Sequence, residues 1–157
     1  MWNKIKPYVI SVALALAVGG FAAFLTMDSM SVYAEIQKPL LAPPSILFPI
    51  VWSILYVLMG VGAAIIYTSS AAPLKKERAQ AVYAASLLAN FGWSLIFFNH
   101  RAYLFAFLWL LVLLFLIVRT ILAYRRISPF AAYLQIPYAL WVAFAGYLNF
   151  AIWYLNR

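Results

Sequence analysis

The residues with the most distinctive chemistry in this chain are aromatic and amide side chains inside otherwise aliphatic segments. Trp52 and Tyr56 are four residues apart, and Asn90 precedes Trp93 by three. Steps of three and four residues place side chains on one face of a helix. An amide among apolar residues in a bilayer is costly unless it is paired, so we expect Asn90 to face a partner or a ligand. Tryptophan, tyrosine and asparagine together suit a flat, mostly apolar, conjugated ligand, held by stacking and a few directed hydrogen bonds.

A second stripe of this kind lies near the C-terminus and has two interpretations. Its members, within about one third of a helix circumference, are Tyr138, Trp141, Ala145, Leu148 and Asn149. Such a stripe can line a ligand site, but periodicity alone favours ordinary aromatic core packing. Pro137 is expected to kink the helix just before Trp141.

The sequence offers little conventional catalytic or metal-binding machinery. No apolar segment carries a pair of acids, and neither a metal-ligand cluster nor a serine with a suitable histidine and acid is present. Phosphate-binding glycine loops are missing, and the absence of cysteine excludes thiol catalysis and thiolate metal sites. We therefore expect no metal and no obligatory cofactor.

Composition identifies the chain as an integral membrane protein. Of its 157 residues, 68% are hydrophobic and 9% are charged, whereas soluble domains carry about 25% charged residues. Segments of roughly 20 mostly apolar residues can cross a bilayer as helices. Five such segments are predicted, at about Ile5–Leu25, Ile46–Thr68, Gln80–Phe98, Tyr103–Leu122 and Pro129–Tyr154. The fold class is therefore all-α, with residues 1–157 forming a single domain, a five-transmembrane-helix bundle.

The distribution of basic residues gives a topology. The formal net charge is +8, but the basic residues stand singly or in short groups at the ends of the apolar segments, as membrane anchors do. We therefore do not expect nucleic acid as a partner. Eight of the eleven basic residues fall on the side of the N-terminus, which favours a cytoplasmic N-terminus if the protein lies in an inner membrane.

The segment from Pro39 to Tyr67 combines a proline cluster with an aromatic ladder. Three prolines between residues 39 and 44 exclude a helix there, so the second helix is predicted to begin near Ser45, which would cap it, with Pro49 in its first turn. The face predicted to point inward contains Trp52, Tyr56, Met59, Ala63 and Tyr67.

The longest loop, Met27 to Pro44, is long enough to fold over the mouth of the bundle, because connections in helix bundles usually take about 2 to 8 residues. It holds two of the three acidic residues, Asp28 and Glu35. We interpret it as a lid; the alternative is an ordinary solvated loop. Just before it, Gly19 and Gly20 permit close approach of a neighbouring helix or simply mark a flexible helix end.

The third segment has a polar aromatic face with Asn90 and Phe97 and an opposite face of small residues. This small face includes Ala81, Ala85 and Gly92. Small residues let helix backbones approach closely in bilayers. The face therefore suits contact with a second copy of the chain, as a homodimer, or contact within the bundle, and the spacing alone does not decide between them.

Motifs along nearly the whole chain resemble the TspO/MBR family, which groups tryptophan-rich sensory proteins of bacteria with the mitochondrial translocator protein, once called the peripheral benzodiazepine receptor. The similar motifs, in order, are Lys38-Pro39, Pro43-Pro44, Phe48-Pro49, Val51-Trp52, Leu55-Tyr56, Asn90, Trp93, Phe97-Phe98, Ser128-Pro129, Pro137-Tyr138, Trp141, Ala143-Phe144 and Leu148-Asn149.

The resemblance implies a five-helix bundle, commonly dimeric, with one pocket near the long first loop. It implies porphyrins such as protoporphyrin IX or haem as ligands, sterols in animal members, and synthetic isoquinoline and benzodiazepine compounds. The matching pocket positions are Trp52, Tyr56, Asn90, Trp93, Phe97, Trp141, Phe144, Ala145 and Leu148. The stripe described above adds Tyr138 and Asn149. Some bacterial members degrade porphyrin through tryptophans that match Trp52 and Trp141, which makes these two the candidate catalytic residues.

The chain departs from the family pattern at two places. Leu41-Ala42 stands where the family usually has a tryptophan before its proline pair, and Ser94 and Leu95 replace the prolines that follow the third-segment tryptophan. We expect a changed lid contact at the first place and the loss of a kink at the second. The expected function is tetrapyrrole binding as a sensor, scavenger or carrier. The alternatives are light- and oxygen-dependent porphyrin degradation and a structural scaffold that recruits partner proteins.

Overall fold

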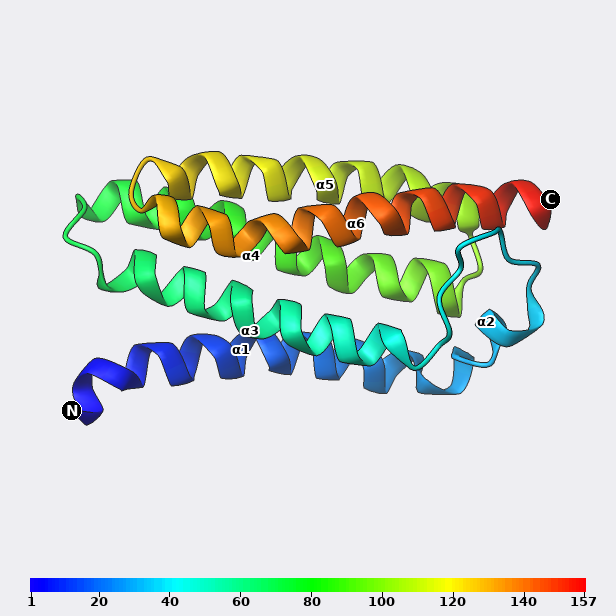
Figure 1. Cartoon of the computed structure of the whole chain (residues 1–157), viewed down its shortest axis with the longest axis horizontal. Helices are drawn as coiled ribbons and strands as arrows, with labels where there is room; N and C mark the ends of the chain where they lie inside the picture. Colours follow the sequence, from blue (N-terminus) through cyan, green and yellow to red (C-terminus); the bar gives the residue numbers. More distant parts are fainter.

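Five long helices account for most of the chain in the computed structural model, which describes residues 1–157 (Figure 1). They are α1 (Trp2–Thr26), α3 (Leu47–Thr68), α4 (Pro73–Ser94), α5 (Tyr103–Arg125) and α6 (Pro129–Leu155). Each is long and apolar enough to cross a membrane, and the structure contains no strand. The predicted all-α membrane fold with five spans is therefore confirmed. The helix ends differ from the predicted ones by up to seven residues, most at the start of α4, which begins at Pro73 and not at Gln80.

Shorter helical pieces lie at the end of the bundle near the C-terminus. A 3-10 turn (Met27–Ser29) and the four-residue α2 (Val32–Glu35) belong to the long loop between α1 and α3. A π-helical turn (Leu95–Asn99) prolongs α4, and His100 N donates to Leu95 O at 3.2 Å across five residues. The helix is thus irregular where Ser94 and Leu95 replace the prolines of the family pattern, so losing the prolines does not leave a regular helix end.

Prolines and side-chain caps set several helix boundaries. Pro73 and Pro129 lie in the first turns of α4 and α6, where a missing amide costs little. Ser128 caps α6 by accepting a hydrogen bond from Ala131 N at 3.4 Å. The predicted cap at Ser45 is wrong: α3 begins at Leu47 with no side-chain cap, because the carbonyls of Pro44 and Ser45 already accept from Leu47 N and Phe48 N.

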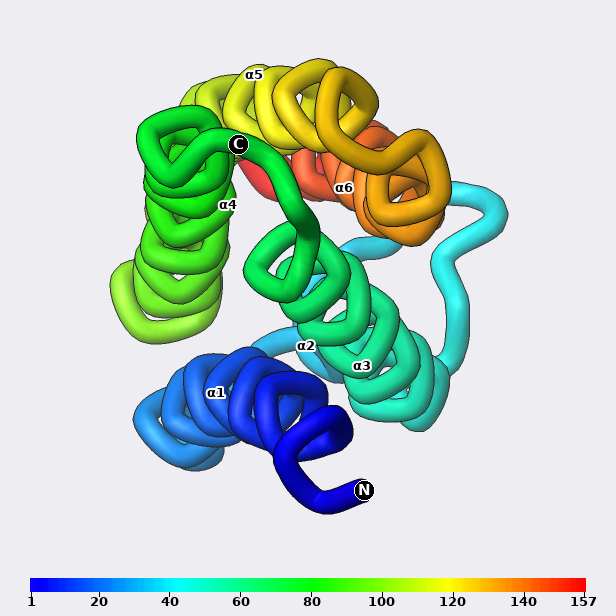
Figure 2. The backbone as a smooth tube through the Cα atoms, turned by 90° about the vertical axis from the view of Figure 1, so that its left-hand side faces the viewer, coloured from blue at the N-terminus to red at the C-terminus, as the bar shows by residue number.

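The five helices form a closed ring when viewed along the bundle (Figure 2). Around the ring, α1 packs beside α3, α3 beside α6, α6 beside α5, and α5 beside α4, which returns to α1. Helix α5 lies on the far side of this ring from α1, and many of its side chains are exposed. The nearly uniform apolar sequence of α5 suits a helix with a large lipid-facing surface.

Glycine permits the close contact between α1 and α3. A Cβ on Gly60 would lie 2.6 Å from Val12 Cα, and the Gly60 carbonyl accepts a hydrogen bond from Ser11 Oγ at 2.7 Å. The inward face of α3 is confirmed for Tyr56, Met59 and Ala63, which are buried. It is wrong for Tyr67, which is 66% exposed and lies against the Lys76 ammonium at the end of the bundle.

The long loop closes one end of the ring. In Figure 1, α6 extends beyond the start of α3, and the loop with α2 occupies the space that α3 leaves. Two reciprocal hydrogen bonds hold the loop there: Gln37 N donates to Asn156 Oδ1 at 3.0 Å, and Asn156 Nδ2 donates to Gln37 O at 2.9 Å. Tyr147 adds a third by donating its hydroxyl to Leu40 O at 2.9 Å.

Candidate ligand-binding site

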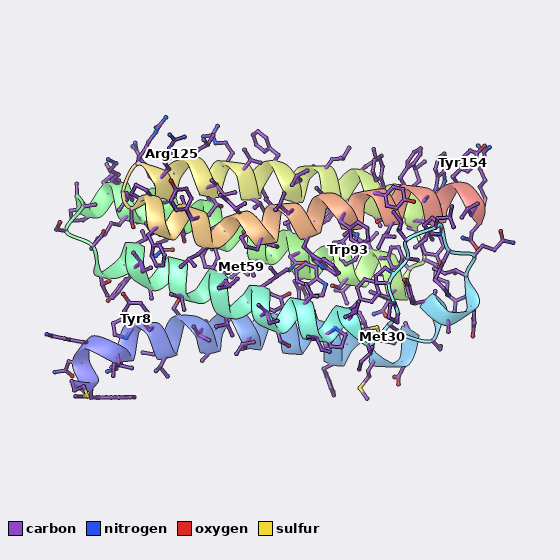
Figure 3. All side chains as sticks on the ribbon, in the orientation of Figure 1. Tyr8, Met30, Met59, Trp93, Arg125 and Tyr154 are labelled. Atoms are coloured by element: carbon purple, nitrogen blue, oxygen red, sulfur yellow. The ribbon has the colours of Figure 1, made fainter.

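A cavity of about 260 Å³ lies between α1, α3, α4 and α6, in the half of the bundle nearest the long loop. Figure 3 shows Trp93 in this half, closer to the loop than Met59. Eight of the eleven predicted site residues line this one cavity: Trp52, Tyr56, Asn90, Trp93, Phe97, Ala145, Leu148 and Asn149. No acidic or basic residue lines it, so the cavity suits a ligand whose contacting surface is mostly apolar.

Asn90 and Tyr56 form a polar pair in the cavity wall. Asn90 is 2% exposed, and its Nδ2 donates to the Tyr56 hydroxyl oxygen at 2.9 Å. This bond uses one donor of the amide and a lone pair of the hydroxyl. The Asn90 Oδ1 and the Tyr56 hydroxyl proton form no hydrogen bond within the chain, so both can serve a ligand with a polar edge.

Asn149 joins α4, α5 and α6 through a second polar set. Its Oδ1 accepts from Trp93 Nε1 at 3.0 Å, and its Nδ2 donates to Tyr103 O at 2.8 Å. Since both ends of the Asn149 amide are bonded inside the protein, this residue fixes the Trp93 ring in place. A fixed ring is a better stacking surface than a mobile one, because less conformational entropy is lost on binding.

Aromatic pairs contribute flat surfaces to the cavity from two helices. Trp52 and Tyr56 on α3 have ring centroids 5.7 Å apart with 30° between their planes. Trp93 and Phe97, from α4 and its π-helical turn, are 5.4 Å apart with 32° between their planes. These pairs supply the faces on which a planar conjugated molecule stacks.

The α1 wall of the cavity was not predicted from the sequence. It consists of small or short side chains, with one leucine: Leu16, Gly19, Gly20, Ala22, Ala23 and Thr26. A Cβ at Gly19 would overlap the Tyr56 ring, which confirms close helix approach at this glycine. The only signal in the sequence was the Gly19-Gly20 pair, which does not indicate what approaches it.

The long loop caps the cavity. Met30 and Tyr33 line the cavity from the loop, so the loop folds over the mouth of the bundle as predicted, and its action as a lid stays a prediction. The Tyr33 hydroxyl donates to Pro43 O at 2.9 Å, and its ring packs on Phe48 with centroids 5.0 Å apart. Burial raises the pKa of the Tyr33 hydroxyl above its ordinary value. Leu41 is 80% exposed with φ 72°, and it does not line the cavity.

Three predicted residues do not line the cavity: Tyr138, Trp141 and Phe144. Tyr138 is buried one layer deeper, where it packs edge-on against Trp52 with centroids 6.1 Å apart. Trp141 and Phe144 pack together behind Phe48, between the start of α3 and the side of α6. The residues of α6 that line the cavity are nearer its C-terminus than Trp141, between Ala145 and Ile152.

The residues of the small face of α4 have different surroundings: Gly92 is covered within the chain, whereas Ala81 is exposed. Gly92 is covered by Trp109 of the same chain, whose Nε1 donates to Ala89 O at 2.7 Å, and a Cβ at Gly92 would lie 3.1 Å from that ring. Gly92 thus serves packing within the bundle. Ala85 is half-buried and Ala81 is exposed, so only this end of the predicted dimer face is open to a second copy.

Comparison with known proteins agrees with these features. The model of the TspO/MBR family matches residues 11–155. The chain is 36% identical to the tryptophan-rich protein TspO of Chlorobaculum tepidum, with 99% of each chain covered. It is 33% identical to the translocator protein of Ovis aries, over 96% of this chain and 92% of the relative. It is 37% identical to protein CrtK of Rhodobacter capsulatus, over 79% of this chain and 78% of the relative. The chain belongs to the TspO/MBR family of multi-pass membrane proteins.

Proposed function

We propose that this protein binds a porphyrin, such as protoporphyrin IX or haem, in the cavity beneath the long loop, and acts as a sensor, scavenger or carrier of that ligand. The observation that supports it most is the combination of two aromatic pairs and one available amide–hydroxyl pair in a single uncharged cavity. A tetrapyrrole offers a large flat face for the rings and a polar edge for Asn90 and Tyr56.

The size of the cavity places a condition on this function. Small-molecule sites typically measure about 300–1,000 Å³, and the cavity of about 260 Å³ lies just below that range. A porphyrin therefore requires the walls to move apart. The wall formed by α1 is held least firmly, since few residues of α1 are buried, whereas α4, α5 and α6 are joined through Asn149 and its two partners.

Porphyrin degradation is the second candidate function. It is supported by Trp52, which lines the cavity. Trp141, the other tryptophan assigned to that chemistry by resemblance, lies behind Phe48 with its Nε1 buried and unpaired. A pair of tryptophans acting on one ligand would require Trp141 to reach the cavity, so binding without degradation is the better-supported proposal.

Incubation of the purified protein with protoporphyrin IX, in light and in darkness, separates the two functions. Binding alone gives a red shift of the Soret band in both conditions with no loss of pigment beyond a protein-free control. Degradation gives light-dependent loss of the band in excess of that control. Absence of any spectral change would instead favour the scaffold alternative, in which the bundle only recruits partner proteins.

A further inference from the structure

The loop between α1 and α3 carries two exposed leucines at its tip. Leu40 is 88% exposed and Leu41 is 80% exposed, and neither lines the cavity. The segment that follows is uncharged, since no charged residue lies between Lys38 and Lys75. Figure 2 shows this part of the loop, in cyan, outside the ring of helices and beside α6. What surrounds the leucines therefore depends on the level of the tip along α6.

Tyr147 fixes the level of the loop tip along the membrane-spanning helix α6. Its hydroxyl donates to Leu40 O at 2.9 Å. Tyr147 precedes Leu155, the last residue of α6, by eight residues, which is about 12 Å along the axis. With 27 residues, α6 is about 40 Å long and exceeds the roughly 30 Å hydrocarbon layer by about 10 Å. Even with all of this excess at the C-terminal end, Tyr147 lies within the hydrocarbon.

Polar and aromatic groups at the end of α6 mark the membrane surface. The Arg157 guanidinium lies over the Tyr154 ring, 4.2 Å from its centroid, and basic and aromatic residues of this kind are typical of the headgroup level. Gln37 pairs with Asn156 at the same level. The three residues from Gln37 to Leu40 can extend over about 10 Å. The loop thus leaves the headgroup level and runs along α6 toward the membrane centre.

The backbone of segment 39–44 has few polar groups left unpaired, as a loop beside lipid requires. Three of its six residues are prolines, which have no N–H group. The Ala42 N–H donates to Pro39 O at 3.3 Å. Four of the six carbonyls accept hydrogen bonds, those of Pro39, Leu40, Pro43 and Pro44. The desolvation cost of placing this segment in hydrocarbon is therefore low for an irregular segment.

Leu41 has a backbone conformation that glycine would adopt more easily. Its φ of 72° lies in the left-handed region, where the Cβ of leucine causes strain. An exposed leucine side chain in water does nothing to offset this strain. Transfer of its apolar surface into hydrocarbon, together with that of Leu40, does offset it.

We infer that Leu40 and Leu41 insert into the hydrocarbon layer beside α6, just beneath the headgroups, so that lipid acyl chains are the partner of the loop tip. The loop over the cavity is then held at three places: by Asn156 at the headgroup level, by Tyr147 below it, and by the bilayer itself. This inference goes beyond the proposed function and does not depend on the identity of the ligand.

A phospholipid that carries a diazirine on its acyl chain tests the inference in the unmodified chain, in lipid nanodiscs. After illumination, mass spectrometry should locate lipid adducts on residues 40–42. Adducts are also expected at Leu140, which is 67% exposed within the α6 span, and serve as the positive control. Ser31, an exposed loop position, should carry few. Replacing both leucines, as Leu40→Ser with Leu41→Ser, should lower the adducts on residues 40–42 and leave those at Leu140 unchanged.

The absence of cysteine from the chain allows a second test with a spin label at Leu41→Cys. The measurement compares the accessibility of the label to oxygen, which concentrates in hydrocarbon, with its accessibility to a water-soluble nickel chelate. The ratio should be near that of Leu140→Cys and above that of Ser31→Cys.

Removing the Tyr147 hydroxyl should release part of the loop. Tyr147→Phe in the spin-labelled chain should lower the ratio of inserted to released loop about 2- to 13-fold, the equivalent of one net hydrogen bond. Tyr133→Phe is the matched control, because Tyr133 is exposed on the same helix and its hydroxyl forms no hydrogen bond within the chain.

The inference is overturned if the parent chain carries no lipid adducts on residues 40–42 while Leu140 is labelled, or if the nickel chelate reaches Leu41→Cys as readily as Ser31→Cys. A disulfide between two Leu41→Cys chains, with low accessibility to both reagents, would also overturn it by assigning the tip to contact between copies. None of these measurements uses porphyrin. Their failure leaves the proposed function untouched, and a failed porphyrin titration leaves the inserted loop standing.

Discussion

The two asparagines of the cavity differ in how their amides are used, and this decides which of them is free to recognise a ligand. Asn149 is bonded at both ends, to Trp93 Nε1 and to Tyr103 O. Asn90 donates to Tyr56 and keeps its carbonyl oxygen free of any partner in the chain. We therefore assign ligand recognition to Asn90 and the positioning of Trp93 to Asn149.

Replacing Asn90 by leucine should weaken ligands with a polar edge by about 0.6 to 2 kcal/mol, the range of intramembrane hydrogen bonds. A purely apolar planar ligand should bind the Asn90→Leu variant and the parent alike. The measurement is paired titration of the two ligand types in nanodiscs. Equal weakening of both would assign Asn90 a structural role. Asn149→Leu, which leaves Trp93 Nε1 and Tyr103 O unpaired, should lower thermal stability more than Asn90→Leu does.

Replacing Trp52 should lower porphyrin affinity, whereas replacing Trp141 should lower stability, although the family resemblance assigns both tryptophans to porphyrin degradation. Trp52→Ala removes a stacking surface of the cavity and should cost about 1 to 3 kcal/mol of porphyrin affinity, by analogy with bases that stack on aromatic side chains. Trp141→Ala should lower the unfolding temperature by leaving a void behind Phe48, with little change in affinity. Dark titration followed by thermal unfolding checks both. A larger loss of affinity in Trp141→Ala would place that ring at the ligand after all.

At the scale of the helices, α1 is the part of the bundle that is held least firmly. Few of its residues are buried, and its close contacts with α3 depend on residues without side-chain bulk, notably Gly19 and Gly60. Without a hydrophobic driving force between helices in lipid, such close packing is a main source of association. The packing of α1 against α3 is therefore sensitive to a single added methyl group at Gly19 or Gly60.

The neighbouring glycines of α1 provide a matched pair of substitutions. Gly19→Ala places a methyl group where the Tyr56 ring lies, so we expect a loss of about 1–3 kcal/mol of stability from overpacking. Gly20→Ala meets open space and should be neutral or slightly stabilising, because alanine favours helix. Thermal unfolding of both variants in the same detergent is the measurement. Equal effects would show that α1 does not contact α3 at Gly19 as described.

Runs of apolar residues predicted the helices, and helical spacing together with the family resemblance predicted most of the residues that line the cavity. Residues such as Trp52, Tyr56, Asn90 and Trp93 combine chemistry that is costly in lipid with helical spacing, so both their element and their facing direction follow from the sequence. Facing direction does not give depth along the bundle. The family resemblance placed Trp141 at the cavity, whereas periodicity alone favoured core packing, and Trp141 does pack behind Phe48 and against the core.

Other features depend on neighbours that the sequence does not identify. Gly20 and Ala23 carry no chemistry of their own, and their place in the cavity follows only from how α1 leans on α3. The π-helical turn after Ser94 and the capping of α3 by backbone carbonyls in place of Ser45 depend on local backbone geometry. Turn chemistry and helix tilt of this kind are set by tertiary packing, which residue spacing does not encode.

For the whole molecule, the ring of helices separates the ligand cavity from the surface available for assembly. The cavity lies among α1, α3, α4 and α6, whereas Ala81 and Leu88 of α4 are exposed on the outside. A homodimer through this face stays a prediction, now limited to the outer part of α4 because Trp109 covers Gly92. An isologous contact there would leave one cavity in each subunit.

Bulk at the exposed end of this face should separate the subunits without altering ligand binding. Ala81→Phe is expected to reduce cross-linked dimer in native membranes, because the ring prevents close approach of two α4 helices. Val118→Phe, at an exposed position of α5, is the control for added bulk. Undiminished dimer in Ala81→Phe, or loss of porphyrin binding together with the dimer, would contradict the assignment.

The central claim, that the cavity beneath the loop holds the ligand, is tested most directly by filling it. Ala145 is buried and lines the cavity from α6, whereas Ala143 lies two residues away on the exposed side of the same helix. Dark titration with protoporphyrin IX should give a saturable Soret shift, one ligand per chain, in the parent and in Ala143→Phe. Ala145→Phe, shown to be folded by thermal unfolding, should give none. Equal binding by the two variants would contradict the claim, and so would the absence of a saturable shift in the parent.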